Sequence, residues 1–125
     1  MKKIILFTIS VITIGCIASG CSKTSDTTPT NGGGGGITFS CIGITPRFSV
    51  EVTSIFTSVC SVNSNCHGAG STNSGGPFTN FTEVFAKRSN IRAQVLSGAM
   101  PQTGSLTQAQ INNLICWIDS GAPNN

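Results

Sequence analysis

The sequence predicts an all-α domain at residues 37–125, carried behind a signal peptide and a flexible linker. Two apolar stripes support this prediction, because in residues 48–60 and again in residues 107–120 the apolar side chains recur at spacings of three and four. No segment shows the turn-bounded alternation that is typical of a β-hairpin. A chain of 125 residues is expected to hold one domain.

Residues 1–20 have the layout of a secretory signal peptide, with Lys2 and Lys3 before an apolar run and small residues before Cys21. The run is shorter than the about 20 apolar residues that a membrane-spanning helix needs. The Ala-Ser-Gly-Cys ending resembles a bacterial lipobox, which implies that Cys21 carries lipid and anchors the protein in the cell envelope, at the outer membrane or the periplasmic face. Ordinary cleavage near Gly20, giving a soluble secreted protein, is the alternative.

Residues 21–36 are expected to form a flexible linker. They include no large apolar residue and end in five glycines, so they cannot bury enough surface to offset the entropy lost on ordering. Charge is nearly balanced beyond the signal peptide, because removing Lys2 and Lys3 from seven basic residues leaves five against four acidic ones. This balance argues against a nucleic-acid-binding protein, which needs a basic surface stripe.

Four cysteines remain for the domain once Cys16 and Cys21 are assigned to the signal peptide and the lipid. Free thiols are unusual in an exported, oxidising setting, and four cysteines allow three disulfide pairings that sequence alone cannot separate. Cys60 and Cys66 lie close together in the sequence, whereas Cys41 and Cys116 lie near the two ends of the domain. A bond between Cys41 and Cys116 would close a loop of about 75 residues and stabilise the fold by about 4 kcal/mol.

The first helix is expected over residues 48–60, with Ser49 as a candidate N-cap. Its β-branched residues lower the intrinsic helix propensity, but the apolar period is nearer 3.6 than 2. Residues 67–77 and 98–104 are rich in Gly, Ser and Asn or bounded by Gly and Pro, and are expected to be loops.

Residues 78–85 are expected to form one or two helical turns, and Ser89 is expected to cap a separate short helix over residues 90–97. The last helix begins with Thr107 and Gln110 as a capping box and has the clearest apolar stripe.

The strongest functional signal is the stretch VCSVNSNCHGAG at residues 59–70, which holds two cysteines, a five-residue spacer and the only histidine of the chain. Covalent haem attachment needs two thiols and a histidine directly after the second thiol. The common spacer has two residues, but doubling a loop costs only about 0.6 kcal/mol, and Ser and Asn form turns readily. The favoured interpretation is that Cys60 and Cys66 bind haem and that His67 binds its iron.

Two other interpretations of the stretch remain open. One is a Cys60–Cys66 disulfide with His67 as a bystander. The other is a zinc site, which lacks a second Cys or His pair unless Cys41 and Cys116 are recruited. A catalytic Cys–His pair is disfavoured, because the compartment oxidises neighbouring thiols and no acidic residue is placed to orient the imidazole.

Met100 is the one methionine beyond the signal peptide, and it precedes Pro101 in a loop between two expected helices. A thioether there can face the iron opposite His67, and His/Met ligation raises the reduction potential. The alternative role for Met100 is to fill a gap in the core.

The domain resembles small bacterial c-type cytochromes of the class I cytochrome c type, in particular those of cell-envelope lipoproteins. The stretches FSVEVTSIFTSVC, NCHG, IRAQVLSGAMPQ and LTQAQINNLICWIDSGAPNN carry the resemblance. It departs from that family in the longer cysteine spacer and in MPQ where MPP is usual. The resemblance implies a cytochrome c-like fold around one covalent haem c, with Trp117 and Phe81 or Phe85 either walling the haem or packing in the core. The residues that it implies are Cys60 and Cys66 as covalent haem ligands, His67 and Met100 as axial ligands, and Cys41 and Cys116 as a disulfide.

The expected function is electron transfer by an envelope lipoprotein, in transient contact with other redox proteins and without enzymatic activity. A haem-free surface binding or structural lipoprotein, stapled by disulfides, is the alternative. A haem sensor or peroxidase would require that Met100 does not bind the iron.

Overall fold

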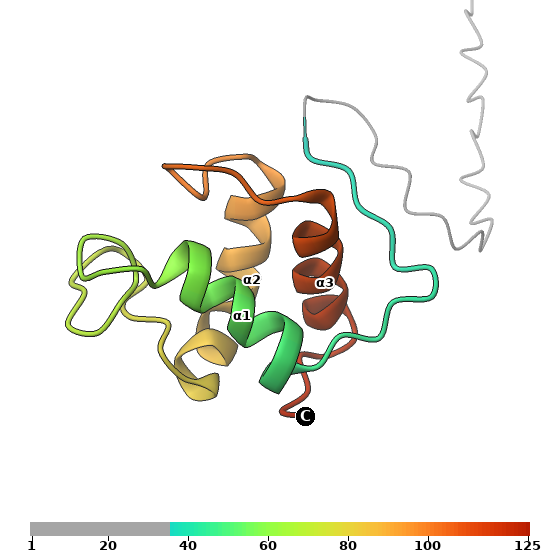
Figure 1. Cartoon of the computed structure of the whole chain (residues 1–125), viewed down its shortest axis with the longest axis horizontal. Helices are drawn as coiled ribbons and strands as arrows, with labels where there is room; N and C mark the ends of the chain where they lie inside the picture. The colour runs from blue at the N-terminus through green and yellow to red at the C-terminus, as the bar shows by residue number, and fades with distance from the viewer. Residues whose placement is uncertain (1–35) are drawn as a thin grey trace, which may run out of the picture.

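The computed structural model describes residues 36–125, and over that range the chain forms helices joined by loops, with no strand (Figure 1). The all-α prediction is therefore confirmed. The predicted signal peptide, the predicted lipid site Cys21 and all but the last residue of the expected linker lie outside the described residues. The helical elements in chain order are π-helix Phe48–Val52, α1 Thr53–Ile55, π-helix Phe56–Cys60, α2 Phe81–Leu96 and α3 Gln108–Asp119.

The first three elements run on without a break, so we name residues 48–60 the first helix. The predicted cap at Ser49 is wrong, because the helix begins at Phe48 and its N-cap residue is Arg47, which has an extended backbone. The chain terminus occupies this helix end instead: Asn125 accepts the Phe48 N–H on its side-chain oxygen at 2.8 Å and the Ser49 N–H on its backbone oxygen at 2.9 Å. These bonds satisfy donors that a helix start leaves open.

The α2 helix replaces the two shorter helical segments expected over residues 78–97. Asn80 is its N-cap, accepting the Glu83 N–H at 3.1 Å, while the Glu83 carboxylate accepts the Thr79 N–H at 2.7 Å. Ser89 lies inside the helix and caps nothing. The residues before it, Ala86 to Arg88, are good helix formers, so nothing interrupts the helix there.

The α3 helix begins with the predicted capping box of Thr107 and Gln110. Its apolar stripe faces the core, and the chain leaves it through Gly121, whose φ of +100° suits glycine. The buried residues of α3 are Ile111, Leu114, Ile115, Cys116, Trp117 and Ile118.

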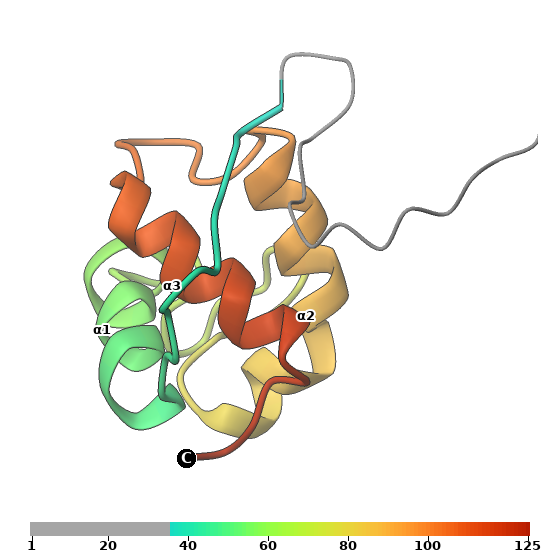
Figure 2. The same ribbon diagram turned by 90° about the vertical axis from the view of Figure 1, so that its right-hand side faces the viewer.

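The core lies where α3 crosses the first helix and α2 (Figure 2). Trp117 is fully buried there, with its ring centroid 5.5 Å from that of Phe48 and 6.4 Å from that of Phe81. Its indole N–H donates to the backbone oxygen of Pro123 at 2.8 Å. Trp117 is thus part of the core.

Residues 37–46, which we name the N-terminal strap, run along the outside of the helices. The strap is bonded to α3 by Ser40 N–H to Asn112 Oδ1 at 3.1 Å, and to the end of α2 by Ile37 N–H to the oxygen of Leu96 at 3.0 Å. A disulfide joins Cys41 to Cys116, with Cα atoms 5.5 Å apart and 75 residues of separation, as the family resemblance implied.

We predict that removing the strap disulfide with the double variant Cys41→Ser/Cys116→Ser lowers the free energy of unfolding by about 4 kcal/mol, because a loop of that length is no longer closed in the unfolded chain. Urea titration followed by far-UV circular dichroism measures the loss. The single variant Cys41→Ser breaks the same bond and should lose as much as the double variant. Equal stability of parent and variants would show that the bond contributes nothing.

Candidate functional site

The candidate site is a loop that starts at the C-terminal end of the first helix. Cys60 is the last residue of that helix, and the His67 N–H donates to the Cys60 oxygen at 2.9 Å. This bond closes the stretch on itself, so the second cysteine and the histidine return to the helix end from which the first cysteine comes. The five-residue spacer therefore projects outward from a closed base.

Asn63 organises the spacer. Its backbone oxygen accepts the N–H groups of Cys66 at 3.1 Å and Gly68 at 2.8 Å. Its side-chain oxygen accepts the N–H groups of Asn65 at 2.9 Å and Cys66 at 3.1 Å. The spacer is thus a compact turn with its own hydrogen bonds, as the Ser and Asn composition suggested.

The two thiols of the loop are half-buried, and neither is in a disulfide in the described part of the chain. Burial raises the pKa of the Cys60 thiol to about 11, with the neighbouring Cys66 as the second cause.

His67 is held by its Nδ1 atom. This atom lies 2.9 Å from the backbone oxygen of Gly76, and because a carbonyl oxygen only accepts, Nδ1 carries the proton. The ring also stacks on Phe78, with centroids 4.2 Å apart and an interplanar angle of 23°. In the neutral imidazole Nε2 is then an unprotonated acceptor, and within residues 36–125 it has no hydrogen bond. Metal-binding histidines are commonly oriented by a bond of this kind from the other ring nitrogen.

Gly75 lets the loop approach the histidine closely. Its φ is +113°, and a Cβ atom there would lie 3.3 Å from the ring of Phe78 and 3.6 Å from the ring of His67. The return of the chain from the loop is fixed by the Phe78 N–H, which donates to the oxygen of His67 at 2.8 Å. Phe78 itself is buried in the core, so the histidine stands on a firm base.

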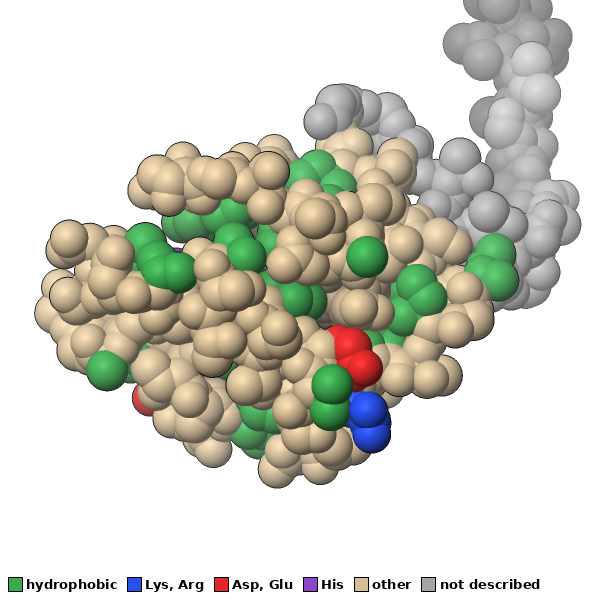
Figure 3. All heavy atoms as spheres, viewed as in Figure 1, with side chains coloured by type: hydrophobic (Ala, Val, Ile, Leu, Met, Phe, Trp, Pro, Cys, Tyr) green, Lys and Arg blue, Asp and Glu red, His purple; other side chains and the backbone are tan. Residues whose placement is uncertain are grey.

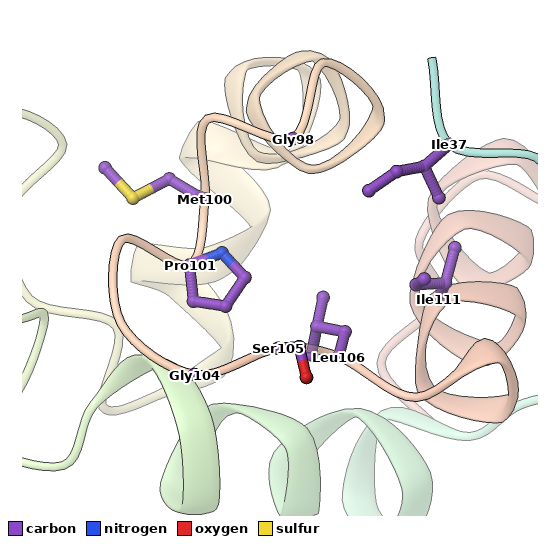
Figure 4. A pocket seen from close by; sticks show the side chains of 8 residues that line it. All are labelled: Ile37, Gly98, Met100, Pro101, Gly104, Ser105, Leu106 and Ile111. Carbon is purple, nitrogen blue, oxygen red and sulfur yellow. The ribbon is translucent and has the colours of Figure 1, made fainter. Parts of the chain in front are cut away.

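Met100 lies on a second loop, residues 97–107, between α2 and α3. Its N–H donates to the oxygen of Gln94 at 3.1 Å, which ties the start of the loop to the end of α2. A cavity of about 150 Å³ lies behind the loop, and its apolar lining consists of Ile37, Met100, Pro101, Leu106 and Ile111. In Figure 4 the Met100 side chain points away from Ile37, Leu106 and Ile111.

The two loops lie on the same side of the molecule, with the Met100 loop above the loop of the cysteines in both ribbon views (Figures 1 and 2). Figure 3 shows the surface hollowed between them, with hydrophobic side chains in the hollow. Two free thiols, an oriented imidazole and a methionine on the facing loop are groups that could hold a covalent haem.

Several residues of the site could not be named from the sequence. Asn63 and Gly76 act through their backbone oxygens or through turn geometry, and these roles cannot be predicted from the residue type. Two more polar side chains hold the second cysteine, since the hydroxyl of Ser71 and the amide of Asn73 both donate to the oxygen of Cys66. The Asn and Ser content of residues 61–74 was the available signal, and it indicated only a loop.

Within the described range no three His, Cys, Asp or Glu side chains converge as a metal-binding group. None of the helices between residues 36 and 125 is long and apolar enough to cross a membrane. No model of a known protein family matches the chain, and no curated protein or solved structure matches it either.

We predict that Gly68→Ala destabilises the protein by about 1–3 kcal/mol, as overpacking does elsewhere. A Cβ atom at this position would lie 2.7 Å from the backbone carbon and oxygen of Asn63, so the spacer turn must shift. Urea titration measures the change. Ser64→Ala is the matched control in the same loop: Ser64 is exposed, and its removal should change stability by less than about 0.5 kcal/mol. Equal stability of the two variants would contradict the importance of the turn.

Proposed function

We propose that residues 37–125 form a cytochrome c-like domain that carries single electrons on one covalent haem. The observation that supports this proposal best is the closed loop from Cys60 to His67, which joins two unpaired thiols to an imidazole oriented through Nδ1. When bound, the haem supplies an iron centre that takes up and releases one electron.

Cys60 and Cys66 would hold the haem through thioether bonds. The His67 imidazole would bind the iron through Nε2, because the Gly76 carbonyl keeps the proton on Nδ1. Such a bond also raises the basicity of the imidazole as a ligand. Met100, on the facing loop, would supply a second protein ligand, and a thioether ligand would raise the reduction potential.

The proposed role is electron transfer rather than bond chemistry. With a histidine and a methionine on the iron, no coordination position stays open for a substrate. Apolar side chains around a bound haem would keep water away from the iron, and this too would favour a higher potential. Other redox proteins are the proposed partners. We further propose that lipid on Cys21 anchors the domain at the cell envelope through the linker.

A haem-free module stapled by disulfides is the second candidate. The Cys41–Cys116 bond favours it to a small degree, because a small domain held by such a bond does not need a cofactor for stability. A second disulfide, between Cys60 and Cys66, would complete that candidate. The two functions require opposite chemistry at the same pair of sulfur atoms, so one experiment separates them.

We predict that the chain, produced in a periplasm that contains haem-attachment machinery, gives a coloured protein whose band on a denaturing gel stains for haem. The double variant Cys60→Ser/Cys66→Ser should lose the stain completely, because both thioether bonds are removed. The matched control Cys41→Ser/Cys116→Ser also removes two cysteines but should keep the stain. A colourless parent protein whose mass shows two disulfides would establish the haem-free candidate.

We predict that Met100→Ala keeps the covalent haem but loses the spectrum of thioether ligation, and that its reduction potential falls by a sizeable part of the about 0.8 V that axial ligands span. Gln102→Ala, an exposed change on the same loop, should leave both spectrum and potential unchanged. Optical titration with redox mediators measures the potential. A thioether spectrum that survives in Met100→Ala would remove Met100 from this role.

A further inference from the structure

Charged side chains are confined to part of the described domain. Residues 52–82 and 93–118 contain no Asp, Glu, Lys or Arg, so both loops of the candidate site lack such residues. On the face shown in Figure 3, red and blue side chains appear only in the lower half, away from the Met100 loop at the top. The charged residues in the described range are Arg47, Glu51, Glu83, Lys87, Arg88, Arg92 and Asp119.

Several charges of this region are engaged by local contacts. Arg92 pairs with Asp119, with Nε and Oδ1 2.7 Å apart. Arg88 lies over the ring of Phe85 at 4.0 Å, and the Glu83 carboxylate is occupied by hydrogen bonds at the start of α2. Four basic against three acidic residues leave a difference of one charge, which creates little field to steer a charged partner.

The surface around the hollow is apolar at its centre and neutral at its rim. Val62, at the outer side of the spacer, is 52% exposed and is one of three exposed large hydrophobic residues in the described range, with Ile42 and Val50. Its neighbours Ser64 and Asn65 are exposed and uncharged, as are Gln102 and Thr103 on the facing loop.

We propose that this uncharged surface, formed by residues 61–65 and 97–107, is where the domain docks for electron transfer, and that it fits a redox partner whose own docking face is uncharged. The inference rests on the proposed function and adds the kind of partner. A partner with a charged face would lose the hydration of its charges here without finding opposite charges in return. Two neutral faces meet without that cost, through the small transient contact typical of redox encounters.

The neutral partner that is always available is a second copy of the same domain. In electron self-exchange, a reduced copy gives one electron to an oxidised copy, and nothing else changes. Proton NMR line broadening in mixtures of the two forms measures the rate constant of this exchange. If docking uses the uncharged surface, the rate constant should change by less than about threefold between about 10 mM and about 500 mM salt, because there are no opposed charges to screen.

Two single substitutions give a matched comparison. Val62→Lys places one charge on the proposed surface, so two lysines face each other in the encounter. Like unit charges about 4 Å apart in water repel enough to reduce an association constant about fivefold. We therefore expect self-exchange of Val62→Lys to be about fivefold slower than the parent at low salt and to recover at high salt. Ser64→Lys is a second variant on the same surface, included because Val62→Lys could disturb the spacer. Its self-exchange should slow by about the same factor.

Val50→Lys is the control, because Val50 is 45% exposed on the first helix, ten residues and about 15 Å of helix before Cys60. It adds the same net charge away from the surface and should exchange like the parent at every salt concentration. A haem-bearing parent with strongly salt-dependent exchange, or equal effects of lysine at positions 50 and 62, would overturn the inference and leave the proposed function standing. A parent without haem would overturn both.

Discussion

The burial of Trp117 is the constraint on which the rest of the structure depends. Its ring touches Phe48 of the first helix and Phe81 of α2, and its N–H binds the chain segment after α3. One side chain thus sets the distance between three helices and the C-terminal tail. Cys116, the residue before it, is bonded to the N-terminal strap, so the largest core residue and the only disulfide of the described range are neighbours. A domain of about 90 residues has a small hydrophobic core. The concentration of contacts around Trp117 explains how such a core can fix the relative positions of the helices.

The candidate site lies outside that core but is anchored to it at both ends. Cys60 ends the first helix, and the chain returns to the core at Phe78, whose ring packs at 5.7 Å from that of Phe56. The hydroxyl of Ser61 donates to the oxygen of Phe78 at 2.9 Å, so the two ends of the loop are also bonded to each other. The core therefore fixes where the loop begins and ends, and the residues between these two points do not have to pack in the core. Anchoring the loop at both ends helps to keep the His67 imidazole in one orientation, because fewer torsion angles near the ring can vary.

The sequence predicted the elements whose signals are local. The capping box at Thr107 and the stripe of α3 lie within a few residues of each other, and both are as expected. The cap at Ser49 was wrong because the actual partner of that helix end is Asn125, which lies at the far end of the chain. The same distinction holds at the site: the adjacency of Cys66 and His67 is visible in the sequence, whereas the Gly76 carbonyl that orients the imidazole becomes a partner only when the loop folds back.

The long spacer is best understood through its hydrogen bonds. Doubling a loop costs about 0.6 kcal/mol of closure entropy, and a single intramolecular hydrogen bond contributes about 1 kcal/mol. The bonds that Asn63 accepts from Cys66 and Gly68 therefore offset the added length. The additional residues then have a consequence that a short spacer would not have: they hold Val62 and Ser64 out in solvent. A loop that costs the fold little can in this way supply a neutral surface next to the proposed haem, so that attachment and docking would depend on the same few residues.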